Sequence, residues 1–283
     1  LALYPRFDFA MVRIPGVLQR IALCYLVVAL FHRTVAHAFR PADARRAVII
    51  TLASAAVLLL AYWALIWRDL TPDGNLGAAI DRAIFGPHLW RQSRTWDPEG
   101  LLSTLPAIGT TLTGLAAGYV LTSDWTARAR MGALLAGSLT ALAIGLAWSV
   151  VFPLNKSLWT SSYVLVTSGL AGLLLAGLHW SLDGGDDAGR ERRGRRLAHP
   201  FVILGRNALL LFVVSGFLAK TLGLIRVDNG EGGTMALGRW IYVSWFVPLA
   251  SPKNASLLFA IANLAVLFAL LWWLHRRRLY FRV

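Results

Sequence analysis

The sequence of 283 residues could form one large or two small soluble domains, but its composition excludes both. Hydrophobic residues make up 57% of the chain and charged residues 15%, which differs strongly from the usual soluble mixture. The formal net charge of +14 does not indicate nucleic acid, because the basic residues lie in short segments between apolar runs and not on a soluble polar face. We therefore expect the lipid bilayer, and no nucleic acid, as a partner.

Seven apolar stretches approach the length of about 20 residues that a helix needs to cross the hydrocarbon core. They are Pro15–Phe31, Val48–Trp67, Leu101–Leu121, Met131–Phe152, Leu158–Trp180, Pro200–Leu224 and Ala255–Trp273. All fourteen acidic residues lie outside them, as the cost of burying a carboxylate in lipid requires. The sequence predicts an all-α, polytopic transmembrane helix bundle, with 1–283 as a single membrane domain.

Two further features complete the predicted architecture. Met235–Leu249 is apolar but short and contains Arg239 and Pro248, which favours an interfacial or re-entrant segment. Gly114 and Gly118 have the small-xxx-small spacing of a close helix contact, and Gly169, Gly172 and Gly177 of the fifth span also predict tight packing in the bundle.

The distribution of basic residues predicts the orientation in the membrane. One set of connections and the C-terminal tail contain fifteen arginines in about 53 residues, against ten basic residues in about 83 on the opposite side. These arginines are Arg33, Arg40, Arg45, Arg46, Arg128, Arg130, Arg190, Arg192, Arg193, Arg195, Arg196, Arg276, Arg277, Arg278 and Arg282. The positive-inside rule makes this side cytoplasmic, so 181–199 is a cytoplasmic loop, 68–100 is an outer loop, and the first residue lies outside.

Polar residues close to the apolar spans are the candidates for function, because each is costly in lipid unless it is paired or used. In Arg13–Arg20, Pro15 suits the first position of a helix, which places Gln19 and Arg20 roughly 6–8 Å inside the span. Arg20 either orients a polar ligand or holds a structural carboxylate. Arg13, at the mouth, suits an interfacial anchor as well as a binding residue.

Asp97-Pro98-Glu99 precedes the third span. Asp97 could be an N-cap with Pro98 as the first helical residue, whereas Glu99 is less well explained by capping. We expect an ion pair between Glu99 and Arg20, which lie at a similar depth.

Asn155-Lys156-Ser157-Leu158-Trp159 joins the fourth and fifth spans. Asn155 suits a turn, but Lys156 and Trp159 between two apolar helices indicate either a site or, for Trp159, an interfacial belt residue.

Arg206 and Asn207 lie about two turns inside the sixth span from the cytoplasmic side. Arg206 could bind a phosphate or extend its charged end to the membrane surface. His88 lies on the outer side with the first three clusters but is a weak candidate for a catalytic base. The histidine spacing does not match a metal site.

Taken in order, these clusters resemble the heparan-α-glucosaminide N-acetyltransferase family and its bacterial relatives. The resemblance is carried by Arg13–Arg20, Asp97–Gly100, Asn155–Trp159 followed by Ser162 and Tyr163, and Asn207, with the basic and aromatic ending Arg276–Val283. It implies a multi-span acyltransferase of the bacterial inner membrane that takes acetyl-CoA from the cytoplasm and acetylates a glucosamine-type sugar outside, without a metal.

The resemblance also implies an incomplete catalytic apparatus. The base in this family is a histidine of an early membrane segment in a His-x-x-Trp-Asn/Asp-Gly type motif, which this sequence lacks, so the catalytic residue is unknown and the chain is expected to be the C-terminal part of a longer protein. The implied acceptor-binding residues are Arg13, Gln19, Arg20, Asp97, Glu99, Asn155, Lys156 and Trp159, with Asn207 on the cofactor path.

Two other functions compete with the transferase. The first is a carrier for N-acetylglucosamine or a related amino sugar, which predicts paired broken helices in corresponding halves. The second is a structural subunit, which leaves the polar clusters unexplained. The sequence is compatible with a homodimer and does not determine the oligomeric state.

Overall fold

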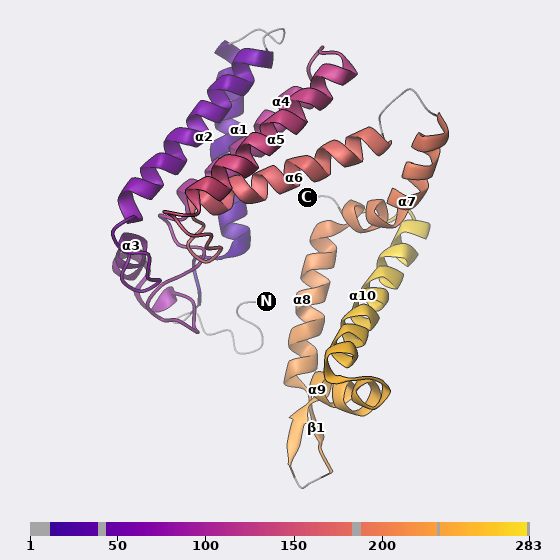
Figure 1. The fold of residues 1–283 in the computed structure, drawn as a ribbon. Helices are drawn as coiled ribbons and strands as arrows, with labels where there is room; N and C mark the ends of the chain where they lie inside the picture. The colour runs from indigo at the N-terminus through magenta and orange to yellow at the C-terminus, as the bar shows by residue number, and fades with distance from the viewer. Residues whose placement is uncertain (1–11, 39–43, 183–187, 231–232, 282–283) are drawn as a thin grey trace. The chain divides into compact units, whose positions relative to one another are not determined.

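The protein is helical and divides into two compact units, Ala2–Glu191 and Arg192–Val283 (Figure 1). The structure, a computed structural model, describes residues 12–38, 44–182, 188–230 and 233–281. The two units are described separately. Whether they form the single membrane domain expected from the sequence stays a prediction.

The first unit contains five long helices and a short one. The long helices are α1 (Val17–Ala38), α2 (Ala44–Ile66), α4 (Thr104–Leu121), α5 (Ala127–Trp148) and α6 (Ser161–Leu182). The connection from α2 to α4 holds α3 (Leu76–Phe85) and the 3₁₀ turn η1 (Gly86–His88). Helix α4 packs against α1, α2 and α6, and α5 packs along α6. The start of α4 and the connection carrying α3 therefore lie at one end of this unit, here called the α3 end (Figure 1).

Helix α2 shows why these segments belong in a bilayer. Its buried residues Ala55, Leu59, Tyr62 and Ile66 recur every three or four positions and face the bundle. The remaining faces are also apolar and exposed; Val57, for example, is 65% exposed. A helix that is apolar on every side is stable at a surface only when that surface meets lipid.

The second unit contains a bent helix pair, a hairpin and one long helix. Its elements are α7 (Ala188–Arg206), α8 (Ala208–Leu224), β1 (Arg226–Asp228), β2 (Thr234–Ala236), α9 (Leu237–Ile241), the π-helical turn η2 (Tyr242–Phe246), the 3₁₀ turn η3 (Val247–Leu249) and α10 (Pro252–Arg276). The strands pair antiparallel, with Val227 opposite Met235. Helices α7 and α8 meet at Asn207 with a bend of 69°.

The predicted fold class is confirmed: six of the described helices are long and apolar enough to cross a membrane, or seven if the bent pair counts as one span. The sixth predicted span, Pro200–Leu224, is not one straight helix but breaks at Asn207. Met235–Leu249 forms strand β2 and short helical turns, none of them of spanning length. The hairpin was not predicted, because three-residue strands leave too short a pattern to recognise.

The tight packing predicted at glycines occurs where Gly169 and Gly172 of α6 meet α5, and not at Gly114 and Gly118 of α4. A Cβ on Gly169 would lie 2.7 Å from the Ser138 carbonyl oxygen and 2.8 Å from the Leu142 nitrogen. At Gly114 and Gly118 no described atom would lie within 4 Å of such a Cβ. The close-contact interpretation of the pair in α4 is therefore wrong for the described structure.

Candidate functional site

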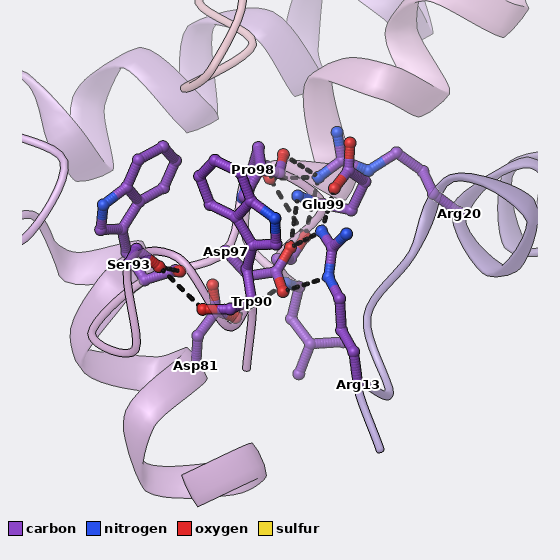
Figure 2. A network of polar contacts seen from close by, with 12 residues as sticks. Arg13, Arg20, Asp81, Trp90, Ser93, Asp97, Pro98 and Glu99 are labelled. Atoms are coloured by element: carbon purple, nitrogen blue, oxygen red, sulfur yellow. Dashed lines mark hydrogen bonds and ion pairs between the residues drawn. The ribbon is translucent and has the colours of Figure 1, made fainter. Parts of the chain in front are cut away.

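The α3 end of the first unit carries an ion-pair cluster of Arg13, Asp97 and Glu99, here called the Arg13 cluster. Arg13 precedes α1, and both carboxylates lie in the segment before α4 (Figure 2). The Arg13 Nε donates to Asp97 Oδ2 at 2.8 Å, and its Nη2 contacts Asp97 Oδ1 and Glu99 Oε2. The Asp97 side chain is fully buried, whereas that of Arg13 is 28% exposed.

The Arg13 cluster corrects two predictions. Glu99 pairs with Arg13, so the expected ion pair between Glu99 and Arg20 is wrong. Asp97 is not the N-cap of α4, because that helix begins only at Thr104. Its Oδ1 instead accepts the Glu99 backbone N–H at 2.9 Å. Arg13 reaches both carboxylates from the segment that precedes α1.

The charge of Arg13 is stabilised by this arrangement. Burial lowers the pKa of the guanidinium, but the hydrogen bonds and charges of Asp97 and Glu99 outweigh burial and raise that pKa above its ordinary value. A two-point contact between guanidinium and carboxylate also fixes the direction of both side chains. Arg13 is thus more than an interfacial anchor.

Arg20 is a buried cation held by neutral oxygen atoms. It is 6% exposed, and its Nη2 donates to the Pro98 carbonyl at 2.8 Å, to the Gly100 carbonyl at 3.2 Å and to the Ser103 hydroxyl. Its Nε and Nη1 are buried and have no hydrogen-bond partner among the described residues. Such a guanidinium is costly in an apolar bundle and marks a functional candidate.

Trp159 completes the surroundings of Arg20. The Arg20 Cζ lies 5.3 Å from the Trp159 ring centroid, and the indole N–H donates to Thr110 Oγ1 at 3.1 Å. Trp159 is half-buried and packs against the core around Cys24 and Leu112. Its packing against this core favours a place in the site over an interfacial belt position. Its φ of 54° is rare for a bulky residue and marks a backbone held by its surroundings.

The other residues of the α5–α6 connection have simpler roles. Asn155 Oδ1 accepts the backbone N–H groups of Ser157 at 2.8 Å and Leu158 at 3.1 Å, which shapes the turn. The Lys156 side chain is exposed and has no hydrogen bond or ion pair with the described residues, while its backbone carbonyl accepts the Trp159 N–H at 3.2 Å. Gln19 is also exposed, with its amide over Gly16. The structure therefore groups Arg13, Arg20, Asp97, Glu99 and Trp159, and leaves Gln19 and Lys156 at the surface.

Sequence reasoning missed Asp81 of α3, which is 3% exposed. Its Oδ1 accepts the Leu101 backbone N–H at 2.9 Å. A Cβ on Gly100 would overlap the Asp81 carboxylate, so the glycine permits this close approach. Burial raises the pKa of Asp81 above its usual value. The available signal was the position of Asp81 three residues after buried Ala78 on the same face of α3.

Asp81 and Asp97 line a small pocket at the α3 end, here called the Asp81 pocket. The volume of this cavity is about 20 Å³, enough for one or two water molecules. The lining also includes Tyr62, Asn75, Trp96, Ser103 and Ser157. Among the described residues no group of three His, Cys, Asp or Glu side chains is placed to hold a metal ion.

Asn207 lies in the second unit and has a structural role there. It is 1% exposed; its Nδ2 donates to the Leu279 carbonyl at 3.3 Å and its Oδ1 accepts the Phe281 N–H at 2.9 Å. Neighbouring Arg206 donates to the Tyr280 hydroxyl at 3.1 Å and lies over that ring. Both residues thus hold the end of the chain, and a cofactor role for Asn207 stays a prediction.

His88 ties the α3 connection to the segment before α1. Its Nδ1 lies 2.9 Å from the Val12 carbonyl oxygen, and its own carbonyl accepts the Ile14 N–H at 3.0 Å. These contacts position Arg13 and account for His88 without a catalytic role.

The helices and the buried ionic groups together define a multi-pass α-helical membrane protein with a polar site at one end of its first unit. No protein-family profile matches the chain. Among curated proteins, it is 28% identical over 250 residues to human heparan-α-glucosaminide N-acetyltransferase. The alignment covers 71% of this chain but only 36% of that enzyme.

Proposed function

We propose that the protein is a membrane acetyltransferase that transfers an acetyl group from acetyl-CoA to the amino group of a glucosamine-type sugar. The observation that carries the proposal is the similarity to human heparan-α-glucosaminide N-acetyltransferase. The polar site supports it, because buried ionic groups in a helix bundle are costly unless they serve a ligand or a reaction.

The proposed reaction forms an amide from a thioester. The amine nitrogen attacks the thioester carbonyl, the C–N bond forms, the C–S bond breaks, and CoA leaves as a thiol after gaining a proton. Attack requires the ammonium to lose a proton first, and the carbonyl oxygen gains negative charge in the transition state. Arg20 supports the second requirement, since its Nε and Nη1 have no partner among the described residues.

The proposed acceptor side comprises the residues of the α3 end. It includes Arg13, Gln19, Arg20, Asp97, Glu99, Asn155, Lys156 and Trp159, with Asn207 on the path of acetyl-CoA. The excess of arginine in the opposite set of connections supports a cytoplasmic donor side and an acceptor outside the bacterial inner membrane.

A carrier for N-acetylglucosamine is supported less well. The break between α7 and α8 is the kind of feature that a carrier uses, but carriers of this type have broken helices in corresponding halves. In the described part of the chain, α7–α8 is the single broken pair.

The test uses the protein made from its whole gene and reconstituted in liposomes. With acetyl-CoA and glucosamine supplied, we expect N-acetylglucosamine to form, as measured by mass spectrometry, and Arg20→Gln to reduce its rate by about 10²–10³-fold if Arg20 stabilises the oxyanion. Arg91→Gln, in the exposed α3 connection, is the control and should leave the rate unchanged. Sugar uptake without acetyl-CoA and without product would overturn the transferase in favour of the carrier.

A further inference from the structure

Three carboxylates of the α3 end, Asp81, Asp97 and Glu99, are buried or half-buried, and they differ in how well they are already paired. Asp97 and Glu99 both contact Arg13, and Asp97 also accepts a backbone N–H. Asp81 has no ion pair with the described residues, and its one hydrogen bond there is from Leu101 to Oδ1. Asp81 is therefore the carboxylate of these three that has no cationic partner among the described residues.

We propose that Asp81 binds the amino group of the acceptor in the Asp81 pocket. The inference rests on the proposed function for the identity of the acceptor, an amino sugar, but it concerns binding and needs no acetyl transfer. It assigns the contact with the ammonium to Asp81 because Asp97 and Glu99 already pair with Arg13.

The position of the second oxygen of Asp81 supports this assignment. Asp81 is 97% buried, since 3% of its surface is exposed, and it lines the pocket, while Oδ2 accepts no hydrogen bond from the described residues. In a residue buried to this extent, a carboxylate oxygen that accepts no hydrogen bond from the described residues favours a ligand that brings N–H groups. Figure 2 shows Asp81 beside Asp97, which is held on its other side by Arg13.

The size and lining of the pocket select the group that enters. A cavity of about 20 Å³ holds a group the size of water or ammonium, but not a sugar ring. Trp96 lines the same space, and aromatic faces attract cations. The pocket thus suits a single ammonium group, with the ring of the acceptor outside it.

The protonation of Asp81 makes the inference sensitive to pH. Burial raises the pKa of Asp81, and the nearby charge of Asp97 raises it further, while the Leu101 hydrogen bond and the charges of Arg20 and Arg82 lower it. Tyr62 also faces this carboxylate, and Arg13 and Glu99 lie beyond Asp97. As pH falls through this raised pKa, Asp81 gains a proton and loses its attraction for an ammonium.

The direct test compares the affinities of glucosamine and glucose, which differ in the amino group, for the whole protein in detergent. Wild type should bind glucosamine about ten- to a hundredfold more tightly, as one charge-assisted hydrogen bond provides. Asp81→Asn keeps the acceptor for the Leu101 N–H and should abolish this preference without changing glucose binding. Asp124→Asn, an exposed change of the same kind, should change neither. A preference that survives Asp81→Asn would overturn the inference.

A second measurement needs only wild type and keeps the inference testable if Asp81→Asn does not fold. Glucosamine affinity should fall as pH is lowered from neutrality to the ordinary pKa of an aspartate, about 4, with the fall beginning above that value, while glucose affinity stays constant. Glucosamine affinity that is constant over this range would overturn the inference.

The two proposals fail separately. If wild type makes no N-acetylglucosamine but binds glucosamine preferentially through Asp81, the transferase proposal is overturned and the proposed amine site is retained. If acetyl transfer occurs and Asp81→Asn leaves the KM for glucosamine unchanged, the proposed amine site is overturned and the transferase proposal is retained.

Discussion

Arg13 and Arg20 are seven residues apart, and their surroundings give the same side chain two different properties. Arg13 has two carboxylate partners and remains partly exposed. Arg20 is buried, stacks near Trp159 and contacts only neutral oxygen atoms within hydrogen-bond distance. Arg13 is therefore fully paired, whereas the Nε and Nη1 of Arg20 have no hydrogen-bond partner among the described residues.

Replacing Arg13 tests its structural contribution. Arg13→Ala leaves the Asp97 carboxylate buried without its cation, and the loss of one partner of a buried pair costs about 3–5 kcal/mol. Arg13 itself is partly exposed, so we expect the lower end of that range. The free energy of unfolding in mixed micelles, followed by circular dichroism, measures the loss.

The control for this change is Arg91→Ala on the exposed surface, with an expected effect within about 0.5 kcal/mol. Because the pKa of Arg13 is raised on folding, its contribution is complete at neutral pH and is lost only as pH rises through that strongly alkaline value. Equal losses for the two variants would show that the Arg13 cluster does not stabilise the fold.

The sequence predicted which polar residues near the spans gather at one site, but not which of them pair with each other. Arg13, Asp97 and Glu99 stood out because lipid excludes charge, and they do lie together. Glu99 was expected to pair with Arg20 but pairs with Arg13. This difference depends on the direction of the side chains, which cannot be read from the spacing of residues in the sequence. Asp81 escaped notice because an acid on a short helix outside the spans looks like an ordinary solvated residue.

At the scale of elements, helix lengths were predictable and helix faces were not. A run of apolar residues specifies a span through its length alone. When all sides of a helix are apolar, periodicity does not identify the side that meets another helix. The glycines of α4 and α6 therefore looked equivalent in sequence, although Gly169 meets α5 and Gly114 has open space among the described residues.

Alanine substitutions at these two glycines should have opposite effects. Gly169→Ala pushes a methyl group against the Ser138 carbonyl and the Leu142 nitrogen, and overpacking of this kind costs about 1–3 kcal/mol. Gly114→Ala meets no described atom and should stabilise α4 by roughly 0.5–1 kcal/mol, because alanine favours the helix. Unfolding of both variants in the same micelles gives the comparison. A Gly169→Ala variant as stable as Gly114→Ala would contradict the close packing of α5 and α6.

At the scale of the whole molecule, the apolar spans made the fold class predictable, while interruptions within them were not. Asn207 breaks Pro200–Leu224 because its amide binds backbone groups of Leu279 and Phe281, more than seventy residues later. Such a long-range contact leaves no local pattern in the sequence. The orientation in the membrane depends instead on a global property, the distribution of arginine between two sets of connections.

Cysteine labelling in intact cells tests that orientation. The single native cysteine, Cys24, is buried and is first replaced by Ala. In this background, Arg91→Cys lies in the α3 connection and Arg128→Cys near the start of α5, both at exposed positions. The positive-inside rule predicts that a membrane-impermeant maleimide labels Arg91→Cys in intact cells and Arg128→Cys only after permeabilisation.

Leu170→Cys, on an exposed face of α6 within a predicted span, is the matched control and should stay unlabelled in both conditions because lipid covers it. Labelling of Arg128→Cys, but not of Arg91→Cys, in intact cells would reverse the orientation. The α3 end would then face the cytoplasm, and the proposed transfer from cytoplasmic acetyl-CoA to an external amino sugar would place the acceptor residues on the wrong side of the membrane.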